Sequence, residues 1–125
     1  MKFARIVFSV AAAYGFLVLT PLYFLLDKLG QAAPPAVNHP EFYYGFVGLA
    51  LVWQPVFVLI ATNPMRYRPI MPIAIFEKFV YTVPVLILYS QGKLAANVLG
   101  PSLVDPIFGL LFLAAYLRTS KPHLT

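Results

Sequence analysis

Four long apolar segments constrain this chain more than any other feature of its sequence. The first runs from about Phe3 to Leu26, and no charged side chain lies between Arg5 and Asp27. The other three run from about 42 to 62, from 70 to 89 and from 94 to 117. A helix needs about 20 residues, at 1.5 Å each, to cross roughly 30 Å of bilayer hydrocarbon. These segments therefore predict transmembrane helices.

The composition excludes the other broad classes of protein. Hydrophobic residues make up 61% of the chain and charged residues 10%, whereas soluble domains have about 45–50% and about 25%. A soluble protein of 125 residues could not bury so much apolar surface, and a disordered chain is poor in such residues. The segments are apolar on every face, which favours helices over barrel strands. We predict one domain over residues 1–125, an all-α integral membrane bundle of four transmembrane helices.

Two of the segments have an alternative interpretation. Pro101 and Pro106 interrupt the fourth, which is either a kinked helix from about Leu94 or a short one from Ser102. We favour the kinked helix, because proline bends a helix and the shorter segment is barely long enough to span. The first segment also resembles a signal peptide, but its apolar run exceeds the usual 7–15 residues. We interpret it as a spanning helix.

The basic residues predict an orientation. The flanks of the segments carry six on one side and two on the other: Lys2, Arg5, Arg66, Arg68, Arg118 and Lys121 against Lys28 and Lys93. Because short cytoplasmic flanks are enriched in Lys and Arg, we expect both termini in the cytoplasm. The net charge of +5 then indicates membrane lipids with anionic headgroups as partners, and no nucleic acid.

Acidic side chains inside apolar segments are the best candidates for chemistry, because they are costly there. Glu77 lies roughly 10 Å into the third segment at 1.5 Å per residue. It could handle a proton or a ligand. We favour instead an ion pair with Arg66, Arg68 or Arg5 that joins the cytoplasmic helix ends. Lys78 points about 100° away from Glu77 and is expected to extend to the headgroups.

The remaining acidic candidates are expected near the outer side. Glu41 and Asp105 each follow a polar residue by three positions, which is the spacing of a capping box. Alternatively, His39 and Glu41 line an outer cavity. Asp27, His39, Glu41 and Asp105 could also converge there on a divalent metal. Their spacing matches no local metal motif, so we predict no metal site.

Polar and small residues inside the segments predict helix contacts. Gln54 lies in mid-membrane, where we favour an interhelical hydrogen bond over contact with a quinone or sterol-like headgroup. Gly45 and Gly48 share a stripe with Glu41, and Ala11 and Gly15 have small-xxx-small spacing in the first segment. The first segment has no polar anchor in its middle. We therefore expect it on the outside, with a partner protein or ordered lipid against Ala11 and Gly15.

Three blocks of the chain resemble a known group of proteins: residues 39–54, residues 63–69 and the pair Glu77–Lys78. They are similar to an uncharacterised family of small four-helix bacterial integral membrane proteins, which implies the bacterial inner membrane and no established activity. In architecture alone the chain is distantly similar to the DoxX-like and EXPERA groups, which include sterol isomerases and sterol-binding proteins. The absence of cysteine excludes disulfides, thiol redox chemistry and cysteine-held metals, and the sequence identifies no cofactor.

These observations lead to two functional hypotheses. The first is a non-catalytic small membrane subunit or lipophile-binding protein, which packs into a larger assembly or holds a lipid, quinone, carotenoid or sterol-like ligand. The alternative is an intramembrane enzyme, such as an isomerase, that uses the embedded acids. An enzyme predicts acids that converge on a pocket, whereas a binding protein or subunit predicts acids that are paired off. We assign no catalytic residue.

Overall fold

The computed structural model describes residues 2–32, 34 and 38–119, and Lys121 of the basic flank lies outside them. The regular secondary structure of the described part is all helical, and this part contains no strand. Its elements, in chain order, are α1 (Lys2–Leu22), α2 (Leu26–Ala32), α3 (Pro40–Thr62), the 3-10 turn η1 (Arg68–Ile70), α4 (Met71–Val80), α5 (Thr82–Ser90), α6 (Ala96–Ser102) and α7 (Val104–Arg118).

Four helical stretches are long and apolar enough to cross a membrane: Lys2–Leu22, Pro40–Thr62, Arg68–Ser90 and Ala96–Arg118. The prediction of an all-α chain with four such helices is therefore confirmed. The third stretch is interrupted at Tyr81 and the fourth at Leu103. Each preceding helix ends four residues before a proline, at Val80 before Pro84 and at Ser102 before Pro106, because proline has no N–H for that carbonyl.

The first helix ends earlier than its apolar run, at Leu22 rather than at Leu26. The N–H groups of Tyr23 and Phe24 bond to carbonyls three residues back, which tightens the last turn. Tyr43 of α3 donates its hydroxyl to the Leu22 carbonyl at 2.6 Å. These bonds occupy carbonyls that the end of a helix leaves without partners.

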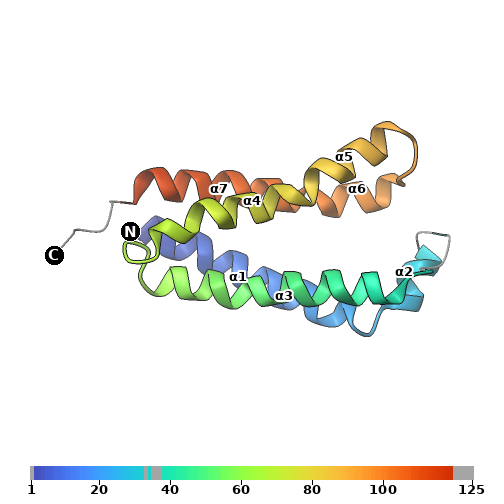
Figure 1. Cartoon of the computed structure of the whole chain (residues 1–125), viewed down its shortest axis with the longest axis horizontal. Helices are drawn as coiled ribbons and strands as arrows, with labels where there is room; N and C mark the ends of the chain where they lie inside the picture. Colours follow the sequence, from blue (N-terminus) through green and yellow to red (C-terminus); the bar gives the residue numbers. More distant parts are fainter. Residues whose placement is uncertain (1, 33, 35–37, 120–125) are drawn as a thin grey trace.

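The helices form two antiparallel hairpins, α1 with α3 and α4–α5 with α6–α7, and α1 also packs against α7 (Figure 1). The start of α1, the 63–67 connection and the end of α7 lie at one end of the molecule. The core joins the hairpins in that half. Phe8 stacks on Phe112 with ring centroids 4.2 Å apart, and Phe57 meets Phe112 edge-on at 5.0 Å.

Two further contacts connect the hairpins away from the core. Phe46 of α3 stacks on Tyr81, at the interruption of the third helix, with centroids 5.4 Å apart. At the far end, the Asn97 amide of α6 donates to the Ala32 carbonyl of α2 at 3.1 Å. Outside the core, the second hairpin therefore also contacts the first at the interruption of the third helix and at the far end.

Candidate functional site

A buried ionic cluster lies where α4 meets α7. The Lys78 ammonium is 3.7 Å from Glu77 Oε2 and 3.7 Å from Asp105 Oδ1. Lys78 is only 5% exposed. Lysine is almost never buried without a partner, and here it has these two. We call Glu77, Lys78 and Asp105 the triad.

Aromatic rings surround the lysine of the triad. Its Nζ lies 5.0 Å from the ring centroid of Phe57, 5.7 Å from that of Phe108 and 5.9 Å from that of Phe112. A cation within about 6 Å of a ring face is attracted by the ring quadrupole. The ammonium is therefore held by two carboxylates in an otherwise apolar setting contributed by α3 and α7.

The triad lies near the middle of two of the stretches that are long enough and apolar enough to span a membrane. Lys78 is ten residues from Arg68 and twelve from Ser90, and Asp105 is nine residues from Ala96 and thirteen from Arg118. Both helix interruptions lie within one turn of it. If these stretches span a bilayer, water does not solvate charges at this depth, and the three groups are then one another's main partners.

A glycine allows α7 to approach α4 closely at the triad. A Cβ atom at Gly109 would lie 2.6 Å from Cε2 of Phe79 and 3.2 Å from Cβ of Lys78. The first distance is shorter than real Cβ contacts allow. Gly109 is one helical turn after Asp105, so the same close approach brings the Asp105 carboxylate to Lys78.

The predicted partners of Glu77 were wrong. The structure pairs it with Lys78 rather than with an arginine, because the third stretch begins at Arg68 and places Glu77 nine residues away, about 14 Å along the axis. Arg68 instead donates from Nε to the Tyr116 and Thr119 carbonyls at 3.3 and 2.9 Å. The expectation that Lys78 extends to headgroups is also wrong, and sequence analysis missed its role.

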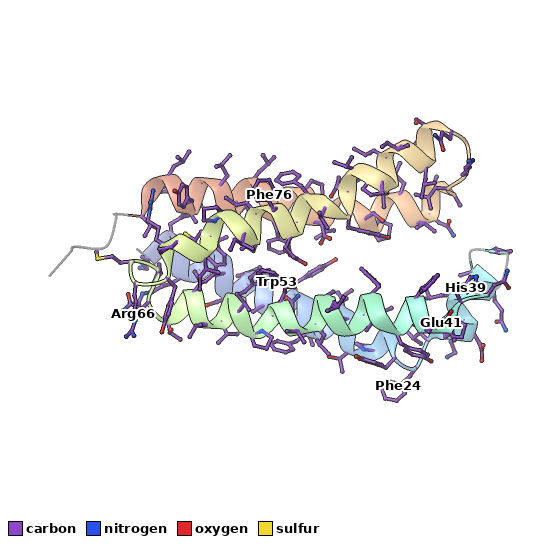
Figure 2. All side chains as sticks on the ribbon, in the orientation of Figure 1. Phe24, His39, Glu41, Trp53, Arg66 and Phe76 are labelled. Atoms are coloured by element: carbon purple, nitrogen blue, oxygen red, sulfur yellow. The ribbon has the colours of Figure 1, made fainter. Side chains whose placement is uncertain are left out.

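The acids of the outer side do not converge. His39 Nδ1 lies 3.1 Å from Glu41 Oε1 in an exposed pair, and Figure 2 shows this pair and Arg66 at opposite ends of the molecule. Asp105 belongs to the triad instead, so the alternative in which it converges with His39 and Glu41 is not what the structure shows. Among the described residues, no group of three or more His, Cys, Asp or Glu could hold a metal.

Neither capping box forms in the structure. His39 is the N-cap residue of α3 and makes no side-chain cap bond. Ser102 Oγ donates backwards to the Val98 carbonyl at 2.8 Å, and the N-cap residue of α7 is Leu103. The exposed Glu41 lies beside His39 and Asp105 beside Lys78, so both carboxylates have side-chain partners in place of the backbone N–H groups.

Within the part of the chain that the structure describes, Gln54 makes no interhelical hydrogen bond, contrary to the prediction. Its amide N–H donates to the Ala50 carbonyl of its own helix at 2.8 Å, and its Oε1 is buried without a partner. A Cβ atom at Gly15 would overlap that oxygen. Gln54 is 1% exposed and packs into the space that Gly15 leaves, rather than facing a ligand.

The small residues of α1 face inward, so the prediction of an outer surface there was wrong. Ala11 is 1% exposed and Gly15 is buried, because α1 packs against both α3 and α7. A Cβ atom at Gly48 would lie 3.2 Å from the Tyr23 hydroxyl, whereas one at Gly45 would meet nothing within 4 Å. The stripe of α3 is therefore packed at Gly48 and open at Gly45.

An apolar concavity of about 470 Å³ lies at the bend between α4 and α5. Its lining consists of Phe76, Phe79, Val80, Val83 and Pro84. We call it the elbow groove. Phe79 connects it to the triad, because this ring rests on Gly109. The triad and the groove together form the candidate site.

No protein-family model matches the chain, and neither a curated protein nor a solved structure matches it. The geometry and the chemistry of the site itself therefore carry the functional conclusion.

Proposed function

We propose that this chain is a non-catalytic integral membrane protein that binds a linear lipophile, a lipid acyl chain or the tail of a quinone, in the elbow groove. The groove has a volume of about 470 Å³, within the range of about 300–1,000 Å³ that is typical of small-molecule sites. Its lining is wholly apolar. This lining is the observation that carries the proposal, because it suits a hydrocarbon chain and offers no group for a polar substrate.

The position of the acids argues against the alternative of an intramembrane enzyme. Glu77 and Asp105 both face Lys78, and neither belongs to the lining of the groove. General acid or base catalysis requires the acid within hydrogen-bond reach of the substrate. Paired acids beside an apolar groove favour binding over chemistry.

The remaining expectations become part of the same proposal. The bias of basic residues supports an orientation with both termini in the cytoplasm, and the sequence resemblance supports the bacterial inner membrane. Ala11 and Gly15 are buried within the bundle, so a partner protein has no access to them. The proposal is accordingly lipophile binding rather than assembly through that face.

Photocrosslinking tests the proposal. The protein would be placed in nanodiscs with a lipid that carries a diazirine on its acyl chain, and the labelled peptides would be mapped by mass spectrometry. We expect labelling concentrated on residues 76–84. Val83→Trp fills the groove and should reduce that labelling several-fold.

Val52→Trp is the matched control, because Val52 is similarly exposed, 65% against 56% for Val83, and lies on α3 outside the groove. It should leave the labelling of residues 76–84 unchanged. Labelling spread evenly over all exposed apolar faces, or unaltered in Val83→Trp, would contradict the proposal.

A further inference from the structure

The triad lies between two interrupted helices. Pro84 and Pro106 have no N–H, so the carbonyls of Val80 and Ser102 lack their helical donors. Both carbonyls lie within one turn of the triad along the chain. Facing helices that are interrupted in mid-membrane are a recurrent setting for ion and proton sites. The two interruptions are an observation independent of the acids, and they lie beside the triad.

The charges of the triad do not balance when every group is ionised. Two carboxylates face one ammonium, which leaves one negative charge in excess. A net charge in the middle of a membrane is costly. Of the neighbouring helices, α3 contributes the ring of Phe57, and α1 contributes Tyr14, whose ring packs against Phe108 with centroids 5.5 Å apart. Neither residue supplies a positive charge.

One oxygen of the triad is buried without a hydrogen-bond partner. Glu77 Oε2 has no donor within hydrogen-bond geometry, and its distance of 3.7 Å to Lys78 Nζ exceeds the usual hydrogen-bond length of about 3 Å. Unpaired buried acceptors are rare in native proteins. The Asp105 side chain is 31% exposed, so one side of the triad is accessible from outside the protein.

We propose that the triad binds one exchangeable proton and is neutral in the resting protein, with one of its two acids present as a carboxylic acid. The proton comes from water and adds to a carboxylate oxygen, which forms an O–H bond and breaks none in the protein. On release it returns to water and leaves the triad with a charge of −1. This site is separate from lipophile binding in the groove, and each can be tested without the other.

Infrared spectroscopy of the protein in lipid tests this site. We expect the wild type to show a carboxylic-acid C=O band at neutral pH that shifts in D₂O and is lost at alkaline pH. Side-chain carboxyl ¹³C labelling of all Asp or of all Glu should shift the band with one of the two labels, which shows in the wild type whether the protonated acid is an aspartic or a glutamic acid. No carboxylic-acid band at neutral pH would overturn the proposal.

Substitutions of the two acids give a second readout. Glu77→Gln and Asp105→Asn each leave one carboxylate with one ammonium, so each should lose the band at neutral pH while circular dichroism shows unchanged helix content. Glu41→Gln is the control outside the triad and should retain the band. A band that survives in both triad variants belongs to another carboxyl and overturns the assignment.

Discussion

Gln54 and Gly15 show how single residues determine the packing of the first hairpin. The Gln54 side chain is fully buried and directs Oε1 at the position where any other residue at 15 would have its Cβ. Helices in lipid associate through close packing of this kind, since no water is available to be released. The side chain of Gln54 and the absence of one at Gly15 therefore act as a unit.

Gly15→Ala should destabilise the bundle by about 1–3 kcal/mol, because the added methyl overlaps Gln54 in a packed interface. The free energy of unfolding in mixed micelles would measure the effect. Gly45→Ala is the matched control, since a Cβ there meets nothing within 4 Å, and it should be neutral or slightly stabilising. Equal losses in both variants would show that position 15 is not specifically packed.

Lys78→Met should cost about 3–5 kcal/mol of stability at neutral pH, because it leaves the ionised acid of the triad without its counter-charge. Lys28→Met, at an exposed position on α2, should change stability by no more than about 0.5 kcal/mol. The same unfolding measurement compares them. A Lys78→Met protein as stable as the parent would mean that the triad does not hold α4 to α7.

At the scale of elements, the positions of the helices could be predicted from the sequence, whereas the contacts between helices could not. Hydrophobic length and the prolines predicted four helical segments and an interrupted fourth one. The same proline rule applies to Pro84, yet the interruption at Tyr81 was not predicted. The partner of Glu77 depends on which faces α4 and α7 present to each other, which Gly109 decides by allowing close contact. Periodicity within one segment holds no information about that distant contact.

Pro84→Ala should restore a donor to the Val80 carbonyl and make α4 and α5 one continuous helix. One added backbone hydrogen bond contributes about 1 kcal/mol, so amide hydrogen exchange over residues 81–85 should slow about fivefold. Pro55→Ala is the control, because α3 continues through that proline without interruption. Unchanged exchange at 81–85 would show that Pro84 does not cause the break.

On the scale of the whole molecule, charge is distributed along the long axis. The described basic residues Lys2, Arg5, Arg66, Arg68 and Arg118 belong to the elements that meet at one end, where α1 begins and α7 ends (Figure 1). Lys28 of α2 and Lys93 belong to the opposite end. The asymmetry was readable from the sequence, because it depends only on which segments are apolar and on their alternating direction. It predicts an orientation in the membrane without reference to any side-chain contact.

This asymmetry predicts the side of the membrane on which each end lies. A fluorescent reporter that folds only in the cytoplasm, fused after Thr125 beyond the described residues, should be bright. The same reporter inserted between Gln91 and Gly92, in the turn that joins α5 to α6, should be dark. One helical stretch on each side of that turn separates it from the basic end of the molecule, so the turn is expected outside. A phosphatase that is active only outside should give the reciprocal pattern.

A bright insertion at residue 91 together with a dark fusion at residue 125 would mean that the inserted orientation is inverted. Equal signals at both positions would mean that the last helical stretch does not cross the membrane.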